Sequence, residues 1–357
     1  MSEIARTKTH PVMVGSVQVG GGAPVSVQSM CTTKTDDPDA TLHQIKKLAK
    51  AGCEIIRVAI PDVKALDGFE EICKYSPLPV VADIHFDYKL ALEAAKRGAA
   101  ALRINPGNIG SMERVDAVID AAKEAHIPIR IGVNAGSLAK EFDTRQDMTL
   151  VEKLVASSKS FVEHFSSRGF EDIVLSAKAH DVPTTLAAYR ALSKELPQIP
   201  LHVGVTEAGA LRQGTVKNSA AVGILLESGI GDTMRLSLTA DPVEEVHVAW
   251  ELLAALGMRR IKPELVSCPT CGRCGVDMIP IAEEVTKRLD GVHAPISVAV
   301  MGCVVNGPGE ARGVDLGVAC GKGQAVLFEN GNPIRKVPED KIVDELFAEI
   351  ENRFGKK

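Results

Sequence analysis

Short apolar runs rich in β-branched residues alternate with longer helical patterns of Ala, Leu, Glu and Lys from about residue 25 to residue 262. The helical patterns often stop at glycine, as at Gly52 and Gly98. The runs expected to form strands are Val25–Met30, Glu54–Ile60, Val80–His85, Ala101–Asn105, Ile127–Val133, Asp172–Lys178, Leu201–Thr206 and Thr233–Thr239. Regular alternation of strand and helix predicts a parallel sheet. Eight units favour a closed (β/α)8 TIM barrel, and an open doubly wound sheet is the alternative.

The pattern changes after Ile261-Lys262-Pro263. We expect a cysteine-rich loop, a helix, a strand, two further strands around a turn and a last helix. The helices are placed near Asp277–Leu289 and Glu339–Arg353, the first strand at Ile296–Met301, and the turn at Asn330-Gly331. The sequence therefore predicts two domains, a barrel over residues 1–262 and a small α+β domain over residues 263–357.

Composition excludes several classes of protein. The chain of 357 residues is 45% apolar and 24% charged, which is ordinary for a globular protein. A net charge of −5 and only 4% aromatic residues argue against nucleic-acid binding. The longest apolar runs fall far short of the roughly 20 residues that a membrane-spanning helix needs, and the N-terminus has no apolar signal-peptide core. These features predict a cytoplasmic protein.

Positive side chains lie in or at the ends of five otherwise apolar strand runs. They are Arg57, Arg103, Arg130, Lys178 and Arg235. Polar residues that share a face with them or with Asp83, or lie close by, are His85, Asn134 and Ser237. Barrel active sites lie at the carboxyl ends of strands, where the matching positions offer only Asp83 and Glu207 as acids. A single arginine could pair with a neighbouring carboxylate, but an excess of about three buried charges predicts a phosphate or diphosphate ligand.

Five of the eight cysteines lie in the last quarter of the chain. In a reducing compartment such a cluster indicates a metal or redox site rather than disulfides. Spacing alone selects Cys268, Cys271 and Cys274, in the pattern C-x2-C-x2-C, with Cys303 as a distant fourth ligand. Zinc and an iron–sulfur cluster both tolerate this spacing. The remaining cysteines are expected to be ordinary buried residues: Cys31, Cys53, Cys73 and Cys320.

Through nearly its whole length the chain resembles the (E)-4-hydroxy-3-methylbut-2-enyl diphosphate synthases, a bacterial iron–sulfur enzyme family. The resemblance rests on VADIHFD, LRINPGNIG, IRIGVNAGSL, GVTEAG, GIGDTMRLSLTADP, SCPTC and GCVVNGPGE. It implies a TIM barrel followed by a small iron–sulfur domain that carries a [4Fe-4S] cluster. The implied ligands are Cys268, Cys271, Cys303 and Glu310, so Glu310 replaces Cys274 of the set chosen by spacing.

The resemblance also implies an oxidoreductase of the non-mevalonate isoprenoid pathway. It would open the ring of 2-C-methyl-D-erythritol 2,4-cyclodiphosphate and remove water, with two electrons arriving singly from flavodoxin or ferredoxin. The five cations would hold the diphosphate, and His85, Asn134 and Ser237 would lie nearby. Glu207 would be the acid or base, and Asn306 would orient the substrate beside Glu310 and the cluster. Family members are homodimers in which the small domain of one chain closes over the barrel of the other, with a hinge here near Ile261–Glu264.

Two alternatives remain from other classes. A barrel aldolase or hydrolase acting on a sugar phosphate would carry a structural zinc and need no reductant. An iron–sulfur assembly or iron-sensing protein would transfer its cluster readily and tolerate loss of the barrel arginines.

Overall fold

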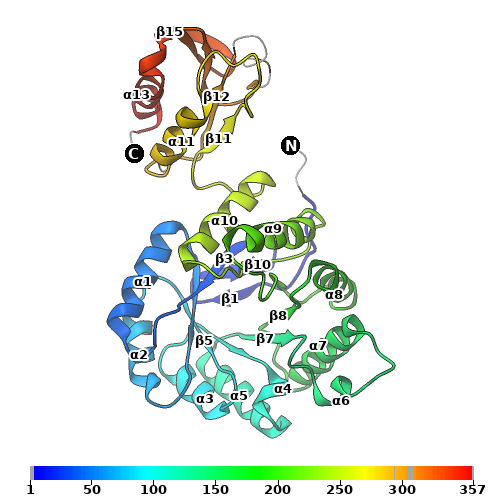
Figure 1. The fold of residues 1–357 in the computed structure, drawn as a ribbon. Coiled ribbons are helices and arrows are strands. Elements are labelled where there is room, and N and C mark those ends of the chain that lie inside the picture. Colours follow the sequence, from blue (N-terminus) through cyan, green and yellow to red (C-terminus); the bar gives the residue numbers. More distant parts are fainter. Residues whose placement is uncertain (1–3, 293, 304–308, 310, 356–357) are drawn as a thin grey trace. The chain divides into compact units, whose positions relative to one another are not determined.

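The computed structural model describes residues 4–292, 294–303, 309 and 311–355. Contacts between residues divide the chain into two compact units, Met1–Arg259 and Arg260–Lys357. Figure 1 shows the first unit as a ring of helices around strands, and the second as a small sheet with helices. The two units are described separately below.

The first unit is built on a parallel sheet of eight strands in the order β8-β7-β6-β5-β4-β3-β10-β9. The strands are β3 Ser26–Met30, β4 Ile55–Ala59, β5 Val80–Asp83, β6 Ala101–Ile104, β7 Ile129–Asn134, β8 Ile173–Lys178, β9 His202–Val203 and β10 Thr233–Met234. An isolated parallel bridge between Leu175 and Leu201 connects β8 to β9 and nearly closes the barrel. The expected TIM barrel is therefore confirmed, and each expected strand run overlaps an observed strand.

The last two barrel strands are much shorter than the sequence predicts, with two residues each. After β10 the backbone leaves the ladder and finds other partners. Thr239 donates its backbone N–H to the carbonyl of Gly209 at 3.0 Å, and Leu238 donates to a side-chain carboxylate rather than to a neighbouring strand. Apolar residues recur in these segments because the segments are largely buried, although they do not continue the strand hydrogen bonding.

Helices surround the barrel, and two of them, α1 and α10, begin at an aspartate directly before a proline. They are α1 Pro38–Ala51, α2 Ala65–Tyr75, α3 Tyr88–Lys96, α4 Pro106–Ile109, α5 Met112–Ala125, α6 Lys140–Asp143, α7 Leu150–Ser167, α8 Val182–Glu195, α9 Leu211–Glu227 and α10 Pro242–Ala255. Asp37 caps α1 by accepting a hydrogen bond from Ala40, and Gly52 ends it in the left-handed conformation. No helix in the described ranges is both long enough and apolar enough to cross a bilayer.

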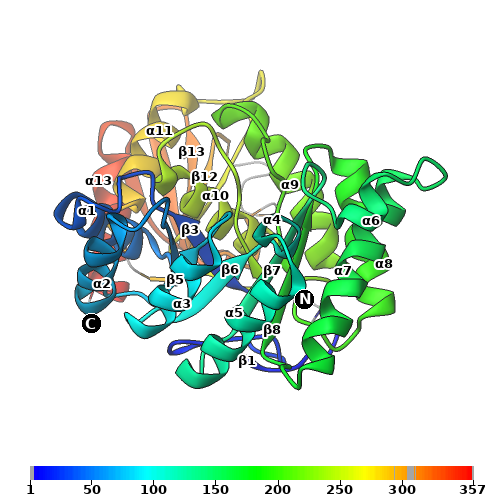
Figure 2. The ribbon, with the colours of Figure 1, turned by 90° about the horizontal axis from the view of Figure 1, so that it is seen from below.

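A hairpin that the sequence pattern did not reveal covers the amino ends of the barrel strands. Its strands are β1 Val12–Val14 and β2 Val17–Val19, paired antiparallel. Val12, Val14 and Val19 pack against a layer of apolar residues at the starts of β4, β5, β6 and β8. Figure 2 shows β1 beneath one end of the strands. The barrel is therefore closed by an apolar plug at the end opposite to the expected active site.

The second unit is a five-stranded sheet in the order β11-β12-β13-β14-β15. Its elements are β11 Glu264–Ser267, α11 Met278–Leu289, β12 Ser297–Met301, β13 Leu316–Gly321, β14 Gln324–Glu329, β15 Asn332–Pro338, the short 3-10 helix η1 Glu339–Lys341 and α13 Ile342–Phe354. The first three strands are parallel, and β14 and β15 form the expected hairpin around Asn330-Gly331. The α+β class is confirmed, although the sequence pattern missed β11 and β13.

Candidate active site

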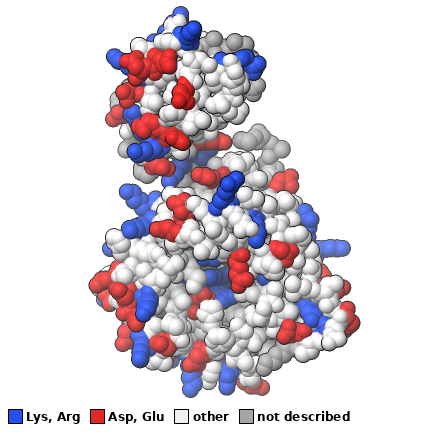
Figure 3. Space-filling view, in the orientation of Figure 1, with Lys and Arg blue, Asp and Glu red and all other residues white. Residues whose placement is uncertain are grey.

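Five positive side chains gather inside the barrel. This cation cluster consists of Arg57 on β4, Arg103 on β6, Arg130 on β7, Lys178 on β8 and Arg235 just after β10. In Figure 3 basic side chains are visible inside a hollow on the face of the barrel unit. The side-chain alternation inferred from sequence therefore does bring these residues together, from four strands and from the segment that follows a fifth.

Glycines allow the long cationic side chains to cross the barrel. A Cβ atom on Gly132 would lie 2.7 Å from Arg103 Nε, and one on Gly204 would lie 2.8 Å from Lys178 Nζ. Both distances are shorter than a van der Waals contact. The absence of a side chain at these two inward positions is thus part of how the cluster is packed.

Asp83 on β5 is the carboxylate at the centre of the cluster and is 1% exposed. Its Oδ1 accepts a hydrogen bond from Arg103 Nη1 at 3.0 Å, and its Oδ2 lies 3.4 Å from Arg57 Nε. Burial alone would raise the pKa of Asp83, but Arg57, His85 and Arg103 together hold it well below the usual range. Asp83 is therefore ionised and fixes the two guanidinium groups.

Arg130 and Lys178 have no such partner. Both side chains are buried, and neither makes an ion pair with any residue in the described part of the chain. Burial, reinforced by neighbouring cations, holds the pKa of each well below its ordinary value. Arg130 Nε and Nη2 are buried without a hydrogen-bond partner in the structure. Buried cationic donors without an anionic partner are costly, and a bound anion would offset that cost.

The second carboxylate of the cluster comes from a helix. Glu245 on α10 is 3% exposed, and its Oε1 lies 3.0 Å from Arg235 Nη2. The sequence instead offered Glu207 as the second acid. Glu207 is exposed, has left-handed backbone (φ 52°) and makes no ion pair with a described residue. No spacing rule connects a helix residue to a strand arginine, so sequence reasoning missed Glu245.

The other predicted contact residues lie around the cluster at the strand ends. His85 follows β5, has a half-exposed side chain and places Nε2 3.5 Å from Asp83 Oδ2. Asn134 ends β7 in register with Lys178 on β8. Ser237 accepts a hydrogen bond from Arg235 Nη1. All three therefore border the cation cluster, as the alternation of side chains predicted.

A small cavity of about 20 Å³ lies beneath the cluster, between it and the apolar plug. Its lining includes Gln28, Arg130, His202 and Thr233. Both ring nitrogens of His202 and Thr233 Oγ1 lack hydrogen-bond partners, and so does Gln28 Oε1. This volume and this mixture of donors and acceptors suit one internal water molecule. Burial and the nearby cations lower the pKa of His202, which keeps its ring neutral.

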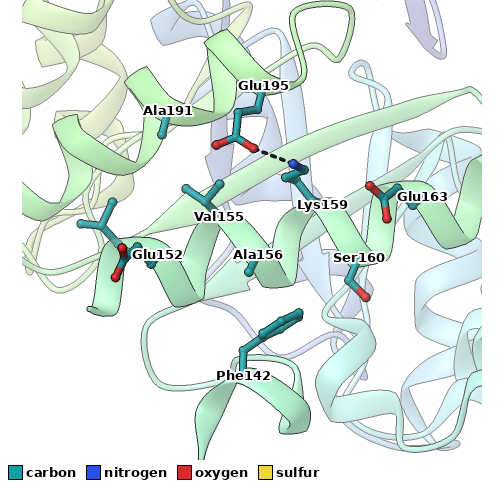
Figure 4. Close-up of a pocket in the computed structure, with 10 residues that line it drawn as sticks. Phe142, Glu152, Val155, Ala156, Lys159, Ser160, Glu163, Ala191 and Glu195 are labelled. Carbon is teal, nitrogen blue, oxygen red and sulfur yellow. Dashed lines mark ion pairs between the residues drawn. The ribbon is translucent and has the colours of Figure 1, made fainter. Parts of the chain in front are cut away.

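A second concave region lies on the outside of the barrel, between α6, α7 and α8. Figure 4 shows this groove of about 520 Å³, with Phe142 and Val155 among its apolar residues and an ion pair between Lys159 and Glu195 across one side. None of the predicted site residues lines it. The residues of the cation cluster lie in the barrel interior instead.

The cysteine-rich loop follows β11 in the second unit. Cys268 comes directly after this strand and donates its backbone N–H to Val300 on β12, and Cys303 follows the carboxyl end of β12. Because β11 and β12 are parallel neighbours, their carboxyl ends bring Cys268 and Cys303 to the same edge of the sheet. Thr270 has left-handed backbone (φ 67°), and this turns the loop between Cys268 and Cys271.

Cys274 packs against the core of the small unit, as Cys268 also does. A Cβ on Gly302 would lie 2.4 Å from the Cys274 sulfur. Cys320 on β13 is fully buried, and burial raises the pKa of its thiol to about 12. Burial therefore favours a packing role for the Cys320 thiol.

The thiols of the loop suit an iron–sulfur cluster in their chemistry, because soft thiolate ligands favour iron–sulfur clusters or zinc. Glu310 and Asn306 lie outside the described residues. Among the described residues, no three His, Cys, Asp or Glu side chains are already grouped closely enough to hold a metal ion.

Both units match known family models. Residues 9–250 match the GcpE TIM-barrel domain, and residues 264–352 match the GcpE protein C-terminal domain. A protein of Geobacter sulfurreducens is 53% identical over 352 residues, covering 99% of each chain. One of Clostridium acetobutylicum is 54% identical over 347 residues, covering 97% of this chain and 99% of the relative. Both relatives are called 4-hydroxy-3-methylbut-2-en-1-yl diphosphate synthase (flavodoxin).

Among solved structures, a dihydropteroate synthase of Coxiella burnetii has a TM-score of 0.52 at 12% identity. It covers 70% of this chain and 98% of that one, and it supports the barrel fold alone. The family models and the relatives are stronger evidence, because they extend over both units. They confirm the family resemblance and the enzyme class that the motifs indicated. The chain belongs to the GcpE family, whose curated members include 4-hydroxy-3-methylbut-2-en-1-yl diphosphate synthases.

Proposed function

We propose that this chain catalyses the reductive ring opening and dehydration of 2-C-methyl-D-erythritol 2,4-cyclodiphosphate to (E)-4-hydroxy-3-methylbut-2-enyl diphosphate. The observation that carries the proposal is the excess of cations over carboxylates in the barrel. Five positive side chains meet two buried carboxylates there, Asp83 and Glu245. A compact diphosphate supplies the missing negative charge, and arginine forks match its oxygens.

The cluster we propose is a [4Fe-4S] centre held by Cys268, Cys271, Cys303 and Glu310. When bound, it supplies single electrons and an iron that can act as a Lewis acid toward a substrate oxygen. The proposed electron donor is flavodoxin, which the names of the relatives include. Ferredoxin is the alternative donor. The first unit then has a separate task, which is to hold and protonate the substrate.

The cation cluster binds the diphosphate and stabilises the charge that grows on it as the ring carbon–oxygen bond breaks. Asp83 keeps Arg57 and Arg103 in place during this step. Arg130 and Lys178 gain the anionic partner that they lack in the unliganded barrel. Net reaction requires two electrons, and the hydroxyl that is lost takes up a proton to leave as water.

Glu207 is the proposed donor of that proton. It lies in the segment after β9, at the same end of the barrel as the cluster, and its left-handed backbone is a conformation that costs a non-glycine residue free energy. Such strain persists at functional sites when the surrounding structure imposes it. His85, Asn134 and Ser237 border the substrate, and Asn306 is proposed to orient it.

The test is anaerobic purification followed by Mössbauer spectroscopy and analysis of iron, sulfide and zinc, together with turnover of the cyclodiphosphate by reduced flavodoxin. Arg130→Gln should retain the iron and lose substrate binding. Cys303→Ala should lose the iron and retain binding of inorganic pyrophosphate. A zinc protein without iron, or a protein that forms no allylic diphosphate with its cluster intact, would refute the proposal.

We also propose that the working enzyme is a homodimer whose site combines the barrel of one chain with the small unit of the other. The Glu207→Gln and Cys303→Ala variants are each inactive under this proposal. Mixing them under conditions of subunit exchange should restore part of the activity, because a hybrid dimer contains one intact pair of units. No recovery from folded, exchanging variants would contradict the shared site.

A further inference from the structure

Glu245 is a buried carboxylate that connects three separate parts of the barrel. Its Oε1 lies 3.0 Å from Arg235 Nη2 and also accepts a hydrogen bond from the backbone N–H of Leu238 at 3.0 Å. Its Oε2 accepts a hydrogen bond from Ser29 Oγ at 3.3 Å. One side chain from α10 thus contacts β3, the segment after β10 and a cation of the cluster.

The segment after β10 depends on such side-chain contacts for its position. The strand itself comprises only Thr233 and Met234, and the last backbone hydrogen bond to β9 runs from the Arg235 N–H to the Val203 carbonyl at 3.1 Å. Beyond it, Asn218 on α9 donates its Nδ2 to the carbonyl of Ser237 at 3.0 Å. Glu245 binds the next backbone amide. Strand β9 therefore holds the backbone of Arg235, whereas helices α9 and α10 hold the residues that follow it, and α10 also holds its side chain.

The contacts of Arg235 also determine which of its donors remain for a ligand. Nη2 faces Glu245, and Nη1 donates to Ser237 Oγ. Nε is buried and has no hydrogen-bond partner in the structure. Rotation of the guanidinium would exchange these donors, and the ion pair with Glu245 opposes that rotation.

We infer that Glu245 is a positioning residue: it holds Arg235 so that the free edge of the guanidinium meets the diphosphate of the substrate. This inference rests on the proposed function for the identity of the substrate. It differs from that function because it concerns a helix residue that need not touch the substrate at all. Glu245 fixes the orientation of Arg235, whereas Asp83 fixes the orientation of Arg57 and Arg103.

Removing the charge of Glu245 should lower turnover without weakening the binding of a simple anion. The variant Glu245→Gln makes the pocket more positive, and Coulomb attraction to a simple anion has little directional preference. Binding of inorganic pyrophosphate should therefore be unchanged or up to about tenfold tighter. Turnover should fall at least tenfold, because Arg235 is no longer held in the orientation that stabilises the transition state.

Glu244→Gln is the matched control. Glu244 precedes Glu245 on the same helix, is partly exposed, and has only a 3.9 Å contact with His247. The Glu244→Gln variant removes the same charge without changing the contacts of Arg235. The two variants and the wild-type holoenzyme are compared by calorimetric titration with pyrophosphate, by kcat and KM for the cyclodiphosphate, and by thermal melting. Glu245→Asp, which restores the charge with shorter reach, should recover part of kcat.

Two additional variants keep the test decisive. Ser29→Ala removes one hydrogen bond to the same carboxylate and should lower kcat about two- to fivefold even if Glu245→Gln folds poorly. A double-mutant cycle between Arg235→Gln and Glu245→Gln, read by pyrophosphate affinity, should show coupling of at least threefold. This cycle needs no turnover, so an inactive wild-type protein would refute the proposed function and leave the coupling readable.

The expected result is a fall in kcat for Glu245→Gln alone, with pyrophosphate binding retained and coupling to Arg235 present. Equal kcat for Glu245→Gln and Glu244→Gln would overturn the inference. A parallel loss of melting temperature, pyrophosphate binding and kcat would also overturn it, because that pattern is produced by a purely structural residue.

Discussion

Lys178 should take up a proton when a diphosphate binds. It is the one lysine in the cation cluster, and its buried amine has no carboxylate partner among the described residues. Burial first, and then the arginines around it, hold its pKa well below 10.5. The other four cations are guanidinium groups, which do not lose protons in proteins. The empty barrel can therefore reduce its excess charge chiefly at Lys178.

The size and sign of the effect follow from proton linkage. A bound diphosphate favours the charged amine and raises the pKa of Lys178, so binding takes up at most one proton. Affinity should fall up to tenfold, or about 1.4 kcal/mol, for each pH unit of increase between the pKa of the empty barrel and that of the occupied one. Below and above this window the contribution of Lys178 to the pH dependence disappears.

The unliganded protein should show the opposite trend in its own stability. Its folded-state pKa at Lys178 is lower than that of an unfolded lysine, so the unfolded chain binds more protons between the two values. Across that interval the free energy of unfolding should rise with pH, by up to about 1.4 kcal/mol per unit from this one group. Replacing Lys178 by Met should remove this contribution to the slope.

The assay is calorimetric titration of inorganic pyrophosphate in buffers with different enthalpies of ionisation. The dependence of the observed heat on buffer gives the number of protons taken up. Pyrophosphate itself titrates, so the informative quantity is the difference between wild type and Lys178→Arg, whose side chain remains charged. Wild type should take up more protons than the variant. Equal uptake in the two proteins would refute the reasoning.

Three further predictions concern other parts of the chain. Gly132→Ala should weaken pyrophosphate binding about tenfold in titrations, because its Cβ would lie 2.7 Å from Arg103 Nε and displace a charged hydrogen-bond donor; unchanged affinity would show that Arg103 does not bind the ligand. Cys274→Ser should retain iron after anaerobic reconstitution, whereas Cys271→Ser should lose it, and loss of iron from both variants would support the ligand set chosen by spacing. Thr149→Ala removes a capping box at the start of α7 and should cost about 1 kcal/mol, lowering the melting temperature by roughly 2–4 °C, whereas no shift would mean that the cap contributes nothing.

Periodicity was sufficient to predict the barrel strands and the inward direction of their cations. Each strand is apolar, parallel and buried, so its run of residues is visible without knowledge of its partners. Arg103 and Arg130 interrupt such runs and pair in register across β6 and β7. Both facts follow from local sequence, which explains why the cation cluster could be predicted before the fold was known.

Features that depend on distant contacts could not be predicted in this way. The strands of the β1–β2 hairpin have only three residues each, too few to show a period. Glu245 lies among the first turns of a helix, where acidic residues are common for reasons unrelated to any active site. Its pairing with Arg235 depends on how α10 packs against β3, and this is a tertiary property. Glu207 was the more visible acid because it follows a strand.

The short strands β9 and β10 leave one side of the barrel with few hydrogen bonds between strands, and we call this side the seam. From β3 to β8 the ladder is continuous, whereas β8 and β9 are joined by the single bridge between Leu175 and Leu201. Amide hydrogens along the seam should exchange with solvent through local opening, and those of the continuous ladder only when the whole unit unfolds. The segments carrying Glu207 and Arg235 emerge from this seam. Substitutions can therefore change that side of the site while the continuous ladder from β3 to β8 is left intact.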